Sequence, residues 1–169
     1  PCLQGRVMTS TASGMDGSSF GCLNYELIAA GKPSPHMTAY GGEERFWLGP
    51  EGGQFSIYFK KDQAFTFANW QVPKEIDTEA FELVSSTQTE AKFKKSMHFE
   101  NYSGVALDVL VQRNIQVLSH SQMNELLGVE VPAELKTVGF ETQNTITNTG
   151  VKAWEQSFLR ELRILPPRT

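Results

Sequence analysis

The sequence predicts an all-β fold, an antiparallel sandwich with a few short helices. Three observations support this prediction: apolar and polar residues alternate along several runs, turn-forming residues separate those runs, and helical periodicity is scarce. The chain has 169 residues, of which 40% are hydrophobic and 20% charged. This length and composition suit one globular domain with a substantial core.

The first half of the chain contains strand-like runs and one short helical segment. Alternation along residues 4–11 is typical of a strand interior. Residues 25–30 can form one or two helical turns, which Gly31 would end. Residues 54–59 predict a strand, and Phe65 and Phe67 continue its pattern after a Lys-Lys-Asp turn.

The second half gives the strongest strand signals. The runs 81–86 and 92–99 precede an Asn-Tyr-Ser-Gly turn at 101–104, which predicts a hairpin. Residues 105–118 form the clearest strand, and residues 137–147 form another that ends at Asn148-Thr149-Gly150. Between these two strands, residues 121–127 predict a short helix that follows Ser119-His120 and stops at Gly128.

Arg113 interrupts the apolar face of the run 105–118. A guanidinium seldom enters a core without a partner, so Arg113 needs a carboxylate or a wet cavity. The alternative is a β-bulge that turns the side chain outward.

The last residues follow a different pattern. Trp154, Phe158, Leu162 and Leu165 recur at helical spacing, and Pro166-Pro167 ends the pattern. We therefore expect a C-terminal helix, which either packs on the sheet or is a tail foreign to the fold.

Composition and motifs argue against several classes of function. A net charge of −4 argues against nucleic acid as a partner, because phosphate binding needs a basic face. No apolar run approaches the roughly 20 residues that cross a bilayer, so no membrane partner is expected. Metal-ligand spacings, a P-loop and a dinucleotide fingerprint are missing, so we expect no metal and no cofactor.

The sequence does not decide in which cellular compartment the protein lies. Cys2 and Cys22 could form one disulfide or remain separate thiols, since neither lies in a Cys-x-x-Cys or zinc spacing. No signal peptide is visible, and Pro1 is not an initiator residue. The chain therefore looks cut from a longer protein, or processed.

The glycine-rich segment 41–53 is the first candidate site. Its five glycines frame Glu43, Glu44, Arg45, Trp47 and Glu51. Glycine lets the backbone take positive φ angles and lets other groups approach closely, so we expect a shaped loop. Glu43 and Glu51 are candidates for a general acid and a general base, with the adjacent Glu43 and Glu44 pointing opposite ways. The alternative is a tight connection that packs Trp47 in the core and leaves the charges solvated.

Four further residues are candidates for ligand contacts. His36 lies in a loop that leads into the glycine-rich segment and is a candidate acid or sugar-hydroxyl partner. Trp70 follows Asn69 after an aromatic run, and an indole beside amides is typical of a sugar platform. Arg45, Trp47 and Arg113 complete the predicted substrate-binding set, although core packing would explain each tryptophan equally well.

The glycine-rich segment also resembles a known family. Gly41-Gly42-Glu43-Glu44-Arg45-Phe46-Trp47, followed by Pro50, is similar to the Gly-Gly-x-x-x-x-Trp-x-x-Pro loop of galactose-mutarotase-like proteins. The segment 144–150, Asn-Thr-Ile-Thr-Asn-Thr-Gly, resembles a strand and turn of their large sheet. The nearest resemblance is to an uncharacterised bacterial group of Bacteroidetes type.

That resemblance implies a β-supersandwich whose concave sheet faces a carbohydrate. It implies an incomplete domain over residues 1–154 and a tail, 155–169, that is not native to the fold. The family's histidine and glutamate acid–base pair does not map onto this chain, whereas Arg113 resembles a sugar-contacting arginine. A periplasmic or secreted location would follow from the same resemblance.

Two functions therefore compete. The first is a carbohydrate-binding or carbohydrate-active domain, and any enzyme activity would be that of an aldose 1-epimerase-like isomerase. The second is a non-catalytic structural or interaction fragment of a larger β-sandwich protein. In either case we expect an exposed sheet edge to favour self-association.

Overall fold

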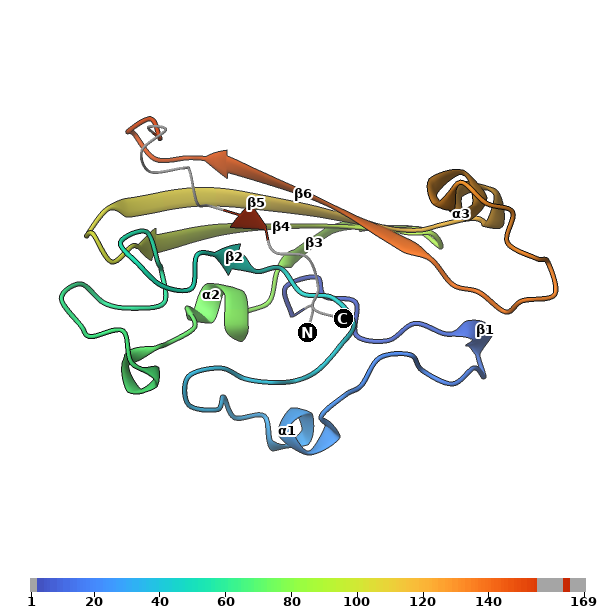
Figure 1. The fold of residues 1–169 in the computed structure, drawn as a ribbon, viewed down its shortest axis with the longest axis horizontal. Helices are drawn as coiled ribbons and strands as arrows, with labels where there is room; N and C mark the ends of the chain where they lie inside the picture. The colour runs from blue at the N-terminus through green and yellow to red at the C-terminus, as the bar shows by residue number, and fades with distance from the viewer. Residues whose placement is uncertain (1–2, 155–162, 165–169) are drawn as a thin grey trace.

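The computed structural model describes residues 3–154 and 163–164, and over these residues the chain is mainly β. Four antiparallel strands form one sheet in the order β3-β4-β5-β6. Figure 1 shows this sheet as one layer, with β2, α1 and α2 all on the same side of it. The strands are β3 (Glu82–Ser86), β4 (Glu90–Glu100), β5 (Ala106–Val117) and β6 (Phe140–Asn148).

Alternation of apolar residues decides which face of the sheet is buried. Met97 and Val109 are partners across β4 and β5, and both are buried. Val111 lies on the same face and is fully buried. Side chains two residues apart point to the same side of a strand, so this face forms the core while the opposite face meets solvent. The predicted strands 81–86, 92–99, 105–118 and 137–147 are confirmed, with small changes at their ends.

The predicted hairpin between β4 and β5 is confirmed. The backbone N–H of Gly104 donates to the carbonyl of Asn101 at 2.8 Å, and the Asn101 side chain accepts the N–H of Val105 at 3.0 Å. Gly104 has a φ of 78°, which glycine adopts without steric cost. A short turn therefore joins the two longest strands in register.

The two predicted short helices are also confirmed. They are α1 (Tyr25–Ala30), which ends at Gly31 in the left-handed region, and α3 (His120–Leu127). A capping box starts α3: Ser119 accepts the N–H of Gln122, whose side chain accepts the N–H of Ser119. The structure adds α2 (Lys74–Asp77) and a 3-10 turn, Phe67–Asn69.

Three of the predicted strands are wrong. Residues 54–59 form bends and turns, and four successive residues, 56–59, are buried. Alternation therefore did not mark a half-buried strand here, because this segment is enclosed by the rest of the fold. Residues 4–11 lie in irregular backbone with one isolated bridge, Val7 to Glu44. Phe65 and Phe67 lie on an exposed loop and at the 3-10 turn.

Three short strands complete the described elements, two of them paired with each other. β2 (Leu48–Gly49) pairs antiparallel with β7 (Arg163–Ile164), and β1 (Ala12–Met15) precedes α1. The expected C-terminal helix is wrong at Arg163–Ile164, which is a strand. The remainder of that segment, 155–162 and 165–169, and Cys2 lie outside the described residues.

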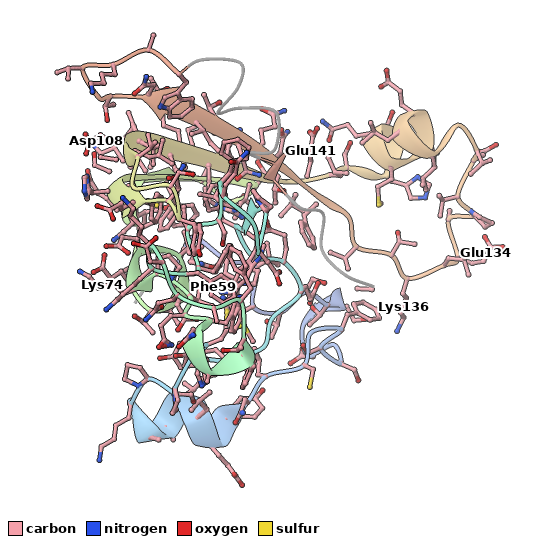
Figure 2. All side chains as sticks on the ribbon, turned by 60° about the vertical axis from the view of Figure 1, so that its left-hand side comes forward. Phe59, Lys74, Asp108, Glu134, Lys136 and Glu141 are labelled. Atoms are coloured by element: carbon pink, nitrogen blue, oxygen red, sulfur yellow. The ribbon has the colours of Figure 1, made fainter. Side chains whose placement is uncertain are left out.

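The core lies between the sheet and the irregular segments beneath it. Figure 2 shows side chains crowded in this region, around Phe59, and sparse around the loop that carries Glu134 and Lys136. Aromatic rings supply much of this core, and each buries a large apolar area. The buried aromatic members of the core are Tyr40, Phe46, Trp47, Tyr58, Phe59, Phe81 and Phe99.

Candidate functional site

The glycine-rich loop has a defined shape, as the sequence predicts. Gly41 and Gly42 have φ angles of 84° and 107°. A Cβ at Gly41 would collide with the carbonyl of Cys22, whereas the N–H of Gly42 donates to that carbonyl at 2.9 Å. Only glycine fits this close approach, so the loop is held against the segment that leads into α1.

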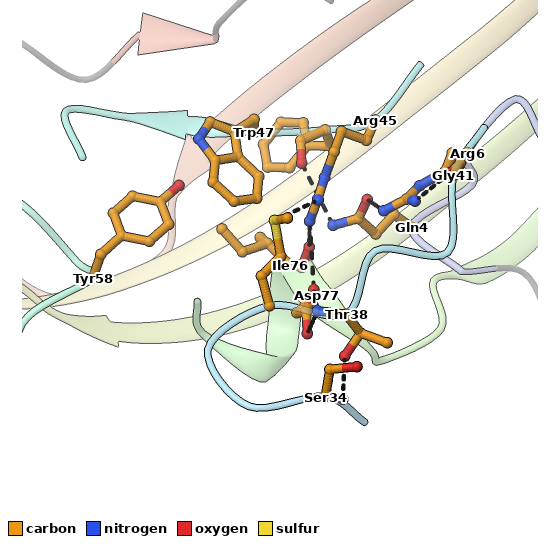
Figure 3. A network of polar contacts seen from close by, with 12 residues as sticks. Gln4, Arg6, Ser34, Thr38, Gly41, Arg45, Trp47, Tyr58, Ile76 and Asp77 are labelled. Atoms are coloured by element: carbon orange, nitrogen blue, oxygen red, sulfur yellow. Dashed lines mark hydrogen bonds and ion pairs between the residues drawn. The ribbon is translucent and has the colours of Figure 1, made fainter. Parts of the chain in front are cut away.

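Arg45, which belongs to this loop, lies at the centre of a network of polar contacts (Figure 3). Its guanidinium donates to the carbonyl of Ile76 at 3.1 Å and lies 3.6 Å from a carboxylate oxygen of Asp77. The same guanidinium lies over the Trp47 ring, with 4.2 Å from Cζ to the ring centroid. A cation in this position is attracted to the indole face. The predicted ligand group Arg45 therefore already has protein partners.

Asp77 was not predicted as a site residue, yet it anchors this network. It lies at the end of α2 and is buried. Both of its carboxylate oxygens accept the backbone N–H of Thr38, at 3.0 and 2.9 Å. Asp77 thereby ties the loop before the glycine-rich segment to α2 and offsets the charge of Arg45. No local pattern in the sequence indicates this role.

Arg6 brings a second guanidinium to the network. It donates to the carbonyl of Gly41 at 2.7 Å and to the side chain of Gln4 at 3.1 Å. Burial is the main cause that lowers the pKa of Arg6 to about 10, and the nearby charge of Arg45 lowers it further. Burial also lowers the pKa of Arg45, while the Asp77 carboxylate opposes that shift.

Trp47 is a core residue whose indole N–H makes a hydrogen bond. It is 9% exposed, and its ring stacks on Tyr58 with centroids 5.2 Å apart. The indole N–H donates to Glu51 at 3.0 Å, so this candidate acid or base orients the indole. The Tyr58 hydroxyl donates to the carbonyl of Leu48, and burial raises the pKa of Tyr58. These contacts match the packing alternative for Trp47.

The adjacent carboxylates Glu43 and Glu44 have different partners, as predicted from their spacing. Glu43 accepts hydrogen bonds from the backbone and the hydroxyl of Ser10. Glu44 is buried and pairs with Arg113 at 2.5 Å. The predicted carboxylate partner of Arg113 is therefore found. The β-bulge alternative is wrong, because the register of β5 runs unbroken past Arg113 on both sides.

His36 and Trp70 are in contact with each other, and Trp70 also stacks on Tyr58. His36 Nδ1 lies 2.7 Å from the carbonyl of Trp70, so Nδ1 carries a proton and donates it to that oxygen. Trp70 stacks between Tyr58 and Phe67, with ring centroids 6.0 and 6.1 Å away. Asn69 donates to the carbonyl of Ala64 at 2.9 Å.

The structure therefore divides the predicted site residues into three groups. Arg45, Trp47 and Glu51 are in contact, and His36 contacts Trp70, which follows Asn69 in the chain. Glu43 and Arg113 each contact other residues.

A groove lined by both polar and apolar residues lies beside the second group, and sequence reasoning found only Asn69 in its lining. Its volume is about 360 Å³. Two segments distant in sequence meet there, 57–73 and the end of β4, and no local pattern brings them together. The lining residues are Ile57, Tyr58, Phe59, Lys60, Lys61, Gln63, Ala68, Asn69, Gln71, Val72, Pro73, Glu100 and Asn101.

The described part of the chain contains neither a metal-binding group of side chains nor a membrane-spanning helix. No three histidine, cysteine, aspartate or glutamate side chains there converge in a way that could hold a metal ion. None of the helices within residues 3–154 has the length and apolar character needed to cross a membrane. Cys22 is exposed.

The fold and the groove define a mainly β domain with a surface groove of mixed polar and apolar lining. The chain belongs to a family of unknown function, DUF6786, whose model matches residues 1–158. Neither a curated protein nor a solved structure matches the chain.

Proposed function

We propose that this chain is a carbohydrate-binding domain that holds a sugar in the groove without catalysing a reaction. One observation carries the proposal: the amide side chains of Gln63, Asn69 and Gln71 line a concave surface. An amide both donates and accepts hydrogen bonds, as a sugar hydroxyl does. Tyr58 and Phe59 also line the groove but are buried. The apolar surface that suits the C–H faces of a sugar ring therefore comes from more exposed lining residues, such as Ala68 and Pro73.

Three of the four amide side chains that line the groove are available for a ligand; the fourth, Asn101, is buried and holds the hairpin turn. Gln63 and Gln71 make no side-chain hydrogen bond to another residue in the described part of the chain, and Asn69 uses only its N–H₂ group. The backbone N–H of Gln71 donates to the carbonyl of Tyr58 at 2.8 Å, which holds the wall of the groove in place. A volume of about 360 Å³ lies at the small end of the range for ligand pockets, which suits a short saccharide.

The positions of the candidate acids and bases favour binding over catalysis. Proton transfer at a sugar carbon needs two groups on either side of one pocket. Glu51 contacts Trp47, Glu43 contacts Ser10, and His36 contacts the carbonyl of Trp70. Among the residues that line the groove, Glu100 is the one carboxylate, and no histidine accompanies it.

The proposal includes a finer description of the fold. The mainly β architecture and the shaped Gly-Gly-x-x-x-x-Trp-x-x-Pro loop support a galactose-mutarotase-like supersandwich, of which residues 1–154 are a part. In that arrangement the binding groove lies at the end of β4 that joins the turn at 101–104. A solved structure of a protein that contains this chain would test the arrangement directly.

Isothermal titration with a panel of neutral and acidic oligosaccharides tests the proposed function. Replacing Asn69 and Gln71 together by alanine removes two hydrogen-bonding amides, and we expect affinity to fall about tenfold or more, at about 1 kcal/mol per bond. The matched control is Gln112→Ala, an exposed amide on β5. Binding that survives in the double variant, or no binding by the parent chain, would contradict the proposal.

The second candidate, an interaction fragment, has one specific observation in its favour. Leu83 and Val84 on β3 are 46% and 53% exposed, and β3 is the outermost strand at one side of the described sheet. Exposed apolar residues on an edge strand favour pairing with another strand. If no oligosaccharide binds, this strand becomes the leading candidate for function.

A further inference from the structure

We infer that the groove selects an acidic saccharide, one that carries a carboxylate or a sulfate which the ammonium groups of Lys60 and Lys61 bind. This inference rests on the proposed function and names the class of sugar. It goes beyond the resemblance, which gives no indication of the sugar's charge.

The first reason is the local charge of the groove. The chain as a whole has a net charge of −4. Lys60, Lys61 and Glu100 are the charged residues among those that line the groove, so its lining is positive at neutral pH. A concave surface with a net positive charge raises the local concentration of anionic ligands.

The second reason is that these two lysines have no carboxylate partner in the described part of the chain, unlike the lysines on the sheet. Lys94 pairs with Glu82 at 3.1 Å, and Lys95 pairs with Glu79 at 2.8 Å. No such pair is found for Lys60 or Lys61. A bound anion could therefore form ion pairs with both ammonium groups without displacing a carboxylate of the protein.

The third reason is that a tight turn fixes the backbone of both lysines, and the side chain of Lys61 lies against the hairpin turn. Gln63 donates its N–H to the carbonyl of Lys60 at 3.2 Å, and Asp62 has a φ of 64°, so residues 60–63 form a tight turn. The side chain of Lys61 lies along the hairpin turn: a Cβ at Gly104 would be 3.5 Å from its Cδ and 3.9 Å from its Nζ. Lys61 therefore lies against the hairpin that follows Glu100.

The combination of groups also fits an acidic sugar better than a simple anion. Next to the lysines lie Asn69 and Gln71, whose amides suit hydroxyl groups. A small anion would use the lysines alone, whereas an acidic sugar would use both sets of groups. The two cases differ in their sensitivity to substitution of the amides.

Isothermal titration of the intact chain with four probes tests this inference. The probes are a galacturonic acid trimer, a sulfated hexose trimer, a neutral hexose trimer and inorganic sulfate. We expect at least one acidic trimer to bind about tenfold more tightly than the neutral trimer. Its affinity should fall as the ionic strength rises from about 0.05 to 0.5 M, because salt screens exposed charges.

Two double variants test whether Lys60 and Lys61 cause the preference for the acidic trimer. Lys60→Gln with Lys61→Gln should remove the preference for the acidic trimer and leave the affinity for the neutral trimer unchanged. The matched control, Lys92→Gln with Lys94→Gln, removes two lysines of the sheet that already pair with Glu90 and Glu82. This control should keep the preference. Thermal melting of each variant confirms that it is folded.

Different results separate this inference from the proposed function. Equal affinity for the acidic and neutral trimers, both weakened by the Asn69→Ala and Gln71→Ala changes, would overturn the inference and leave carbohydrate binding standing. Inorganic sulfate that binds as tightly as the acidic trimers would also overturn it, in favour of a simple anion site. If no trimer binds, the proposed function itself fails, and the inference with it.

Discussion

Arg113 on β5 and Glu44 in the glycine-rich loop form a buried ion pair, with 2.5 Å between Nη2 and Oε2. The two side chains are 0% and 8% exposed. The Arg113 guanidinium also lies 5.8 Å from the centroid of the Phe46 ring. This pair attaches the candidate loop to the central sheet, because it joins residues 69 positions apart in the chain.

Removing one member of this pair should be costly. Glu44→Gln leaves a buried guanidinium without a compensating charge, so we expect the free energy of unfolding to fall by about 3 to 5 kcal/mol. Urea denaturation at pH 7 measures the change. The control is Glu82→Gln, which removes an exposed pair with Lys94 and should cost under about 1 kcal/mol. Similar losses in both variants would show that burial does not make the Arg113 pair special.

The contact between Trp47 and Glu51 predicts a second pair of outcomes. Trp47→Ala removes a core indole, and we expect a loss of about 3 to 5 kcal/mol in the free energy of unfolding. Glu51→Gln keeps an oxygen that can accept the indole N–H, so its effect should be within about 1 kcal/mol. Thermal and urea melts of the two variants measure both. A large loss in Glu51→Gln would mean that its charge, and not only its oxygen, stabilises the loop.

Glu79 predicts a pH dependence. Lys74 lies 2.7 Å and Lys95 2.8 Å from its carboxylate, and the hydrogen bonds from Lys74 and then Lys95 hold its pKa below the usual value. A carboxylate whose pKa is lower in the folded state contributes stability above its unfolded pKa of about 4.3 and loses it as the pH falls through the folded value. Glu79→Gln should therefore lower the melting temperature slightly at pH 7, by about 2 °C, and make no difference at low pH. A difference that grows on acidification would refute this assignment.

The exposed edge strand β3 predicts self-association. Val84 is 53% exposed on this strand, and Leu83 is 46% exposed. Val84→Lys places a charge on the edge, which opposes pairing with another strand, and we expect it to lower the apparent mass of any oligomer. Light scattering over a range of protein concentrations measures this. A control is Val151→Lys, because Val151 is fully exposed but lies outside the strands. If both changes act alike, general surface hydrophobicity and not the strand edge drives association.

Local sequence patterns predict a strand or a helix end correctly where the segment has one buried face and one exposed face, or ends at a glycine. Alternation predicted β4 and β5 because one face of each is buried and the other is exposed, and Gly31 and Gly128 marked the ends of α1 and α3 because both adopt left-handed backbone. The same reasoning was wrong at residues 54–59, where four successive buried residues follow the surrounding packing instead of a strand period. Enclosure by other segments is not encoded in any short window of sequence.

For the candidate site, the sequence by itself determined which residues are unusual, and only the tertiary structure decided what they contact. The glycines of the loop and a guanidinium on an apolar strand face are visible in the sequence, because each breaks a steric or solvation rule within a few residues. Long-range packing decides that Arg113 forms an ion pair with Glu44. It also decides that Arg45 pairs with Asp77 and not with a ligand. The groove likewise exists only where residues 57–73 meet the end of β4, so Lys60 and Glu100 became candidates only after folding brought their segments together.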